Sequence, residues 1–170
     1  GLIVPTGIAT DDSTKVFFPH LVSKRALVSI CSFEDEEFVF KSVHHAFKFC
    51  LLSVCGTDNP VDVAVLSFFL RQVEDFNDSA RRFSLSVDEF SLINPNTQNC
   101  PVFRTGSDAE LTKKIYRRVP VLIKDGAAQI NSWGISFSQG LFNMTSASEL
   151  FQTFDELVFK GAALQSNIFL

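Results

Sequence analysis

Short apolar runs separated by polar turns fill the first half of the chain, and they predict strands. Residues 1–4, 26–33, 46–54 and 61–70 form such runs, with lengths typical of strands rather than helices. The first run is apolar at every position after Gly1, as in a strand that is buried on both faces of a sheet. The last two runs are separated only by the turn formers of CGTDNP. Parallel neighbours need a long crossover connection, and this connection is too short for one. We therefore expect the two runs to form an antiparallel hairpin.

Helical periodicity appears between the first two strands. Phe17, Leu21 and Val22 form an apolar stripe that follows several N-cap candidates at 10–14. Pro19 lies within this pattern, so the helix is either kinked or begins later than those caps suggest. The order strand, helix, strand and hairpin indicates an α/β fold.

Two more helices are expected in the second half. One covers 86–92, with Ser86 at the N-cap and Glu89 three residues later. The other covers 146–160 and ends at Gly161, a typical C-cap residue.

The most specific text in the sequence is 93–122, INPNTQNCPVFRTGSDAELTKKIYRRVPVL. Ser107 and Glu110 have the spacing of a capping box, and Pro120 ends the helix that follows. Leu111, Ile115 and Val119 recur at four-residue steps and predict the buried stripe of this helix. The Asn94-Pro95 pair that precedes the helix is interpreted as a structural turn.

Basic residues cover the other faces of this helix. Contact with DNA phosphates is one interpretation of the following candidates: Arg104, Lys113, Lys114, Arg117 and Arg118. The other interpretation is a solvated helix face, on which Glu110 pairs with Lys114 four residues later. The formal net charge of -4 excludes a protein that binds nucleic acid with its entire surface. This net charge is compatible with a local basic patch.

Composition narrows the chemistry further. The 19 phenylalanines predict core packing, and the four cysteines, none in a C-x-x-C pair, predict reduced thiols in the cytoplasm. The histidines lack metal-ligand spacing with any cysteine, and the acidic run 34–37 is interpreted as a solvated turn. No nucleotide-binding glycine loop occurs, and no apolar run is long enough to span a membrane.

Three separated segments carry a family resemblance: the opening GLIVPTGIATDDSTKVFF, the 93–123 stretch, and NSWGISFSQGLFNMTSASELF. Together they resemble the large single-chain adenine-N6 DNA methyltransferases of restriction-modification and phage-exclusion systems. The resemblance covers essentially the whole chain. It implies a partial class I methyltransferase sheet that ends in an antiparallel hairpin, followed by a mainly helical connector. We expect the first part to comprise 1–75 and the connector 76–170, because the composition turns polar after residue 73.

The resemblance also implies a cofactor and a partner. Members of the family bind S-adenosylmethionine through a glycine-containing motif and act on adenine through an N-P-P-Y motif. Neither motif occurs here, so the resemblance places both upstream of Gly1, and we expect this chain alone to be inactive and to bind no cofactor. In such enzymes an aromatic residue ahead of the first hairpin strand stacks on the flipped-out adenine. Phe40 is the matching position, although Lys41 follows it where relatives often have proline.

The expected partners of the parent enzyme are double-stranded DNA, the missing N-terminal half and a downstream target-recognition domain, in the cytoplasm of a bacterium or archaeon. An alternative of a different class is a stand-alone, non-enzymatic module. Such a module would use the basic helix to bind nucleic acid or a partner protein.

Overall fold

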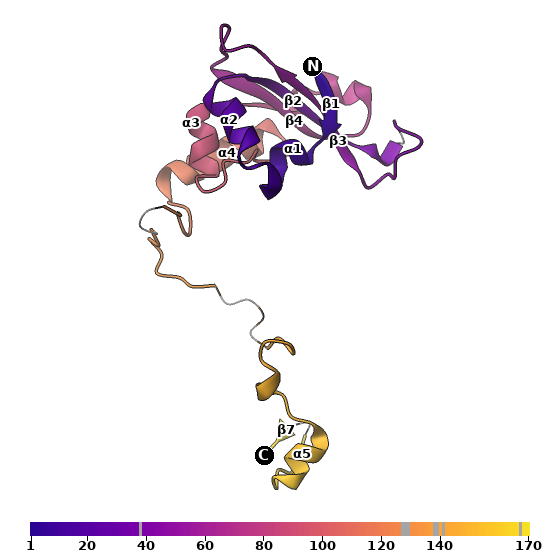
Figure 1. Ribbon diagram of the computed structural model, residues 1–170, viewed down its shortest axis with the longest axis vertical. Helices are drawn as coiled ribbons and strands as arrows, with labels where there is room; N and C mark the ends of the chain where they lie inside the picture. Colours follow the sequence, from indigo (N-terminus) through magenta and orange to yellow (C-terminus); the bar gives the residue numbers. More distant parts are fainter. Residues whose placement is uncertain (38, 127–129, 138–139, 141, 167) are drawn as a thin grey trace. The chain divides into compact units, whose positions relative to one another are not determined.

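The computed structural model describes residues 1–37, 39–126, 130–137, 140, 142–166 and 168–170. The chain forms two compact units, Gly1–Trp133 and Gly134–Leu170. The larger unit contains one sheet with a layer of helices against one of its sides (Figure 1). In the part of the chain that is described, no helix is both long enough and apolar enough to cross a bilayer.

The sheet of the larger unit has five strands in the order β1-β3-β2-β4-β5. Their bounds are Leu2–Pro5 for β1, Leu27–Glu34 for β2, Lys48–Val54 for β3, Val63–Leu70 for β4 and Arg82–Ser86 for β5. Strand β3 is antiparallel to both β1 and β2, so β1 and β2 run in the same direction. Strand β2 pairs in parallel with β4, and β5 returns antiparallel along β4. The sheet is therefore mixed, and the α/β class is confirmed.

The pairing expected between β3 and β4 is wrong. The two strands do run in opposite directions, but β2 lies between them. Their connection crosses the amino end of β2, where Cys55 N donates to Ala26 O and Val61 N donates to Arg25 O, both at 2.9 Å. A short turn fixes the direction of two strands but not their adjacency. The antiparallel hairpin of this sheet is formed instead by β2 and β3.

The edges of the sheet also differ from the sequence-based expectations. Strand β1 was expected to be buried on both faces, yet Leu2 is 53% exposed and Ile3 is 62% exposed. It lies at an edge, and no described residue pairs with its outer side. At the other edge, β5 was not predicted at all, because its five residues, RFSLS, are too few and too polar to stand out.

The helical layer comes from two parts of the sequence. Helices α1 (Gly7–Thr10) and α2 (Phe17–Ser23) connect β1 to β2, whereas α3 (Val87–Ile93) and α4 (Gly106–Arg118) follow β5. Helix α2 does begin later than the N-cap candidates, and Pro19 stands in its first turn, where its missing N–H costs no helical hydrogen bond. Helix α3 has the capping box expected of Ser86 and Glu89.

The core lies between the helices and one face of the sheet. Its helical side consists of Ala9, Phe18, Val22, Phe90, Ile93 and Ala109, which pack with Cys100 against alternate strand residues. In β4 these alternate residues are Ala64, Leu66 and Phe68, all at most 4% exposed. The side chains between them face the opposite side, where Val63 and Val65 are 49% and 41% exposed. The second face of the sheet is thus apolar and partly open.

Helix α4 begins earlier than predicted and is turned the other way. Its N-cap is Thr105, which forms the capping box with Asp108 in place of the expected Ser107 and Glu110. The predicted buried stripe is exposed, with Leu111 at 59% and Ile115 at 49%. The buried positions are Ala109 and Lys113, at 0% and 6%.

The smaller unit, Gly134–Leu170, has no buried residue among those described. The helix expected over 146–160 is divided into a 3-10 turn, Ser148–Leu150, and α5, Phe154–Phe159. Thr153 caps α5 in a box with Glu156. Gly161 ends it as predicted, with a positive φ of 88° that favours glycine. Strands β6 (Leu164–Gln165) and β7 (Ile168–Phe169) pair antiparallel after it.

Candidate functional site

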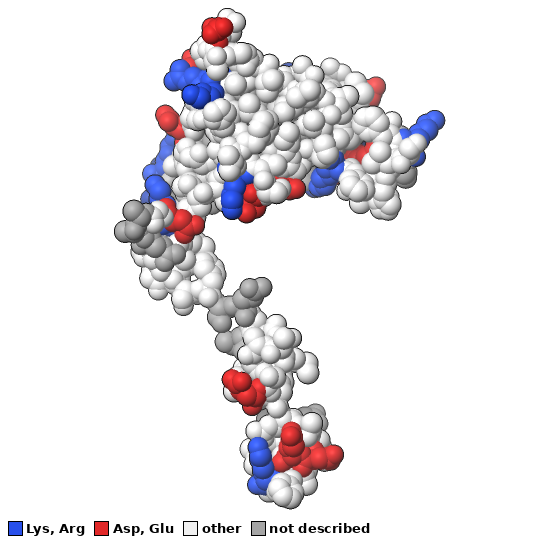
Figure 2. Space-filling model, in the orientation of Figure 1, with Lys and Arg blue, Asp and Glu red and all other residues white. Residues whose placement is uncertain are grey.

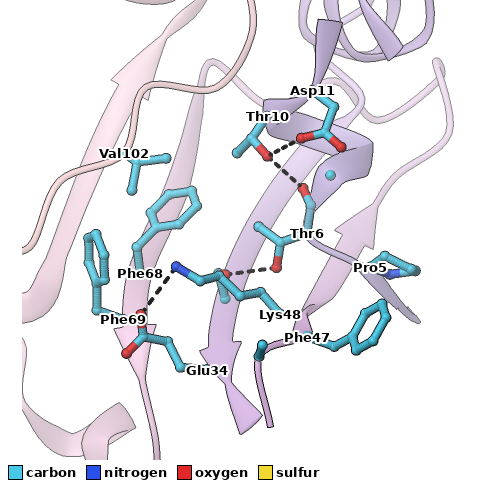
Figure 3. Close-up of a pocket in the computed structure, with 13 residues that line it drawn as sticks. Pro5, Thr6, Thr10, Asp11, Glu34, Phe47, Lys48, Phe68, Phe69 and Val102 are labelled. Carbon is cyan, nitrogen blue, oxygen red and sulfur yellow. Dashed lines mark hydrogen bonds and ion pairs between the residues drawn. The ribbon is translucent and has the colours of Figure 1, made fainter. Parts of the chain in front are cut away.

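The carboxyl ends of β1, β2 and β4 meet at one edge of the sheet, because these three strands run in the same direction. Ligands of open α/β sheets bind at this edge. A cavity of about 460 Å³ lies there, drawn in Figure 3. Its lining is Pro5, Thr6, Gly7, Thr10, Asp11, Ser32, Glu34, Ala46, Phe47, Lys48, Phe68, Phe69 and Val102. Segments from all three strand ends and from the start of β3 therefore contribute to one site.

The floor of the cavity is polar and held in place. The hydroxyls of Thr6, after β1, and Ser32, in β2, are 2.9 Å apart and both residues are buried. Thr6 N also donates to Lys48 O at 3.1 Å. These bonds join the two parallel strands across β3, and they fix where the side chains of the floor point.

A charged pair crosses the cavity between β2 and β3. The Lys48 ammonium lies 3.2 Å from Glu34, and Arg71 lies 3.2 Å from the other oxygen of the same carboxylate. Burial alone would raise the pKa of Glu34, but its hydrogen bonds and charge pairing with Lys48 and Arg71 outweigh burial and lower this pKa. Glu34 is therefore an anion that positions two cations.

Glu34 and its neighbour Asp35 contradict the interpretation of 34–37 as a solvated turn. The Glu34 side chain is only 16% exposed, and Asp35 is fully buried. Asp35 accepts a hydrogen bond from Phe40 N at 3.1 Å, and its own N–H donates to Phe47 O at 3.4 Å. It ties together the loop of the β2–β3 hairpin.

Phe69 forms one wall of the cavity in an unusual backbone conformation. Its φ is +60°, in the left-handed region that aromatic residues rarely adopt. The register of β2 and β4 shifts at this point, between Cys31 and Phe33. Its ring is covered by Arg104, 4.3 Å from the ring centre, and by Lys48 at 5.6 Å. Such strain costs about 1–3 kcal/mol and is typical of functional sites.

Phe40, the candidate for base stacking, lies in the hairpin loop beside a separate apolar cavity of about 260 Å³. Its ring is 37% exposed and contacts the Phe49 ring edge-to-face, with centres 4.8 Å apart. Phe47 and Lys48 line both this cavity and the larger one. Phe40 lines the smaller cavity and is not part of the larger one.

Two of the five basic candidates are engaged with carboxylates. Lys113 contacts Glu89 at 3.2 Å and also pairs with Glu110, and Arg117 lies 2.9 Å from the same Glu89 oxygen. Burial would lower the pKa of Lys113, but the two carboxylates outweigh it and raise the pKa above its ordinary value. Glu110 therefore pairs with Lys113 and not with Lys114. These contacts fix α4 to α3.

The other three candidates, Arg104, Lys114 and Arg118, have no carboxylate within ion-pair distance among the residues that the structure describes. Lys114 and Arg118 are exposed on α4, and Arg104 stands before this helix over the Phe69 ring. On the face drawn in Figure 2, basic and acidic side chains lie close to one another and form no continuous basic surface. Any contact with phosphates would be local.

Sequence reasoning missed Thr6, Glu34, Lys48 and Phe69. Lys48 did leave a signal, since it is the one charged residue within the apolar run AFKFCLLSV. Glu34 was hidden in an acidic run, and Phe69 in a run of apolar residues. Their meeting depends on the strand order, which local sequence does not encode.

Two of the four cysteines, Cys50 and Cys100, are buried. All four cysteines are free, and burial raises the pKa of Cys50 to about 11 and that of Cys100 well above its ordinary value. No group of three or more His, Cys, Asp or Glu residues in those ranges is placed to hold a metal ion.

Comparison of the chain with protein-family models, with curated proteins and with solved structures gives no match. The geometry described above defines the candidate site. It consists of the larger cavity at the strand ends, the loop that contains Phe40, and the cations around Phe69.

Proposed function

We propose that this chain is the C-terminal half of the catalytic domain of a DNA adenine-N6 methyltransferase, with the start of the connector to its target-recognition domain. The parent enzyme would transfer a methyl group from S-adenosylmethionine to adenine in host defence. One observation carries the proposal. The β2–β3 antiparallel hairpin begins at the carboxyl end of β2, and its loop holds Phe40, which is 37% exposed, beside the smaller apolar cavity.

The hairpin agrees with what the family resemblance implies, one strand earlier than the sequence pattern suggested. The resemblance implies a stacking aromatic residue ahead of the first hairpin strand, whereas Phe40 lies in the loop between the two strands of the observed hairpin. Phe40 stands before β3, and Asp35 holds its backbone in place. Its ring has the exposure that a stacking role needs, because a fully buried ring could not meet a base.

The open surfaces of the sheet also support the proposal. Leu2 and Ile3 point to opposite faces of β1 and both are more than half exposed. Strands with apolar residues on both sides occur where helices cover both faces of a sheet. A neighbouring half of the catalytic domain would pair with β1 and cover these residues.

The family's glycine-containing cofactor motif does not occur in this sequence. The Glu34 carboxylate is already taken by two cations. We therefore assign cofactor binding and the transfer step to upstream residues. This chain would supply Phe40 for base stacking, the larger cavity beside it and cations for the DNA backbone.

The test begins with the reading frame upstream of Gly1. We expect it to encode a glycine-containing strand turn and an N-P-P-Y motif, and we expect the full-length protein to methylate adenine in duplex DNA. The 170-residue chain alone should bind no S-adenosylmethionine in a calorimetric titration. A start codon directly before Gly1, or micromolar cofactor binding by the isolated chain, would refute the proposal.

A non-enzymatic interaction module remains the second candidate, and the exposed stripe of α4 favours it. Leu111, Ile115 and Val119 are 59%, 49% and 38% exposed and lie on one side of the helix. A protein partner that packs on this stripe would bind whether or not the upstream motifs exist. The two candidates are separated by methylation activity of the full-length protein.

A further inference from the structure

A polar cavity of about 450 Å³ lies next to the cavity at the strand ends. Its lining is Phe69, Arg71, Gln72, Asp75, Arg81 and Arg104. Phe69 lines both cavities. Three arginines face one carboxylate here, in a protein with a net negative charge.

Two of these arginines are held rigidly. Arg71 uses Nε and Nη2 on the Glu34 carboxylate, both at 3.2 Å. Arg81 donates to Asp78 at 3.3 Å and to Phe69 O at 3.0 Å. Their guanidinium groups are therefore fixed before any ligand arrives, which lowers the entropy that binding costs.

The single carboxylate of the cavity is occupied by the backbone. Asp75 accepts from Arg71 N at 2.7 Å and from Gln72 N at 3.1 Å, and these two bonds are the main reason that its pKa is lowered. Arg81 lies 3.8 Å from its other oxygen. Asp75 thus shapes the cavity. Arg71 is paired with Glu34, and Arg81 with Asp75 and Asp78, so the positive charge that no described carboxylate offsets is that of Arg104.

Arg104 is the arginine of this cavity that has no carboxylate within ion-pair distance among the described residues. It lies over the Phe69 ring, and among the described residues no acceptor for its guanidinium N–H groups is found. Stacking on an aromatic face holds a guanidinium while its N–H donors stay free for a planar or tetrahedral anion. An arginine held in this way in a positively charged cavity is typical of phosphate recognition.

We propose that Arg104, together with Arg71 and Arg81, forms a binding site for a phosphate group, and that this phosphate belongs to a nucleic-acid backbone. The phosphate site rests on the geometry of this cavity alone, whereas its nucleic-acid source rests on the function proposed above. The strained conformation of Phe69 serves the site, because it turns the ring beneath Arg104. A bound phosphodiester would lie in a cavity that shares Phe69 with the cavity at the strand ends.

The first arm of the test uses inorganic phosphate and the 170-residue chain. We expect phosphate to shift the Nε–Hε resonance of Arg104 in a saturable manner, followed by nuclear magnetic resonance. The same titration with Arg104→Gln should show at least a fivefold weaker binding of phosphate, read from the resonances of Arg71 and Arg81. A titration that leaves all three resonances unmoved overturns the site.

The second arm uses a fluorescently labelled 20-mer duplex and binding curves at several salt concentrations. Arg104→Gln should weaken binding at least fivefold and reduce the slope of log affinity against log salt by about one. The control is Arg25→Gln, which removes the same charge from an exposed residue paired with Asp62. Equal losses in both variants would indicate net charge alone and overturn the site.

The two arms also separate the sources of the phosphate. Phosphate binding at Arg104 without any effect of Arg104→Gln on DNA would overturn the nucleic-acid source. Arg104→Lys keeps the charge but loses the fork, so it should recover the salt slope and not the affinity. None of these measurements needs methyl transfer, so a failure of the phosphate site is distinguishable from a failure of the proposed function.

Discussion

At the scale of single residues, the larger unit uses ion pairs to set the direction of side chains. Glu34 holds Lys48 and Arg71 at the strand ends, and Glu89 holds Lys113 and Arg117 between α3 and α4. Both carboxylates are more than four-fifths buried, so water screens them weakly. Lys113 is therefore not free to contact DNA, and its ion pair with Glu89 holds α4 against α3.

Replacement of Lys113 tests this role. Lys113→Met keeps the apolar stem but leaves Glu89 with one cation fewer, so we expect the free energy of unfolding in urea to fall by about 3 kcal/mol. Lys114→Met is the matched control on the exposed side of the same helix, with an expected change within about 0.5 kcal/mol. Equal effects of both variants would contradict the structural role of Lys113.

The pH dependence of stability tests the carboxylate itself. Burial alone would raise the pKa of Glu89, but the Ser86 N–H, Lys113 and Arg117 outweigh it and lower the pKa in the folded protein. This carboxylate therefore stabilises the fold above its unfolded pKa of about 4.3, and the contribution is lost as the pH falls through the folded value.

Urea unfolding at a series of pH values should show this difference. Glu89→Gln should be less stable than the parent at neutral pH, and the gap should narrow once the pH falls below about 4.3 and close as it passes through the lower pKa of the folded protein. Glu74→Gln, at an exposed position, should follow the parent curve throughout. A constant gap between Glu89→Gln and the parent at every pH would refute the ionic origin of the effect.

At the scale of elements, α4 shows how far sequence reasoning reaches. The helix, its termination before Pro120 and its basic character followed from local pattern, because capping and periodicity act within a few residues. The orientation of the helix could not be predicted from local pattern, because it depends on Lys113, which is buried against Glu89 on α3. Apolar spacing alone had assigned the buried face to Leu111 and Ile115, which are exposed.

The strands show the same limit: local pattern predicts an element but not its neighbours in the fold. Four of the five were predicted from apolar runs, whereas the order β1-β3-β2-β4-β5 was not. The hydrogen bonds that decide it join Ala26 to Cys55 and Arg25 to Val61, pairs that are distant in sequence. The cavity depends on this order, so its lining could not be predicted either.

The N-terminus of α4 offers a test of its observed start. Thr105 accepts from Asp108 N at 3.1 Å, so Thr105→Ala should reduce the free energy of unfolding by about 1 kcal/mol. Ser107→Ala, at the N-cap position that spacing alone suggested, should cost less than about 0.5 kcal/mol. The reverse order of the two effects would place the helix start at the later residue.

At the scale of the whole molecule, the proposed parent enzyme is supported by the exposed apolar residues at one edge and on one face of the sheet. The β1 edge offers unpaired backbone groups together with Leu2 and Ile3, and the second face of the sheet adds Val63 and Val65. Exposed apolar edges pair with other strands unless something covers them. In the proposed parent enzyme the upstream half of the sheet would cover this edge.

The isolated 170-residue chain should therefore self-associate through β1. Ile3→Lys places a charge on the edge strand, where charges oppose strand pairing, and we expect it to lower the sedimentation-velocity fraction of dimers and larger species at least threefold. Ile3 is 62% exposed, so the free energy of unfolding should change by less than about 0.5 kcal/mol. Ile115→Lys, which adds the same charge to the exposed stripe of α4, is the control. If Ile115→Lys suppresses association and Ile3→Lys does not, then the apolar stripe of α4 is the interacting surface, and the sheet edge no longer supports the proposed upstream half.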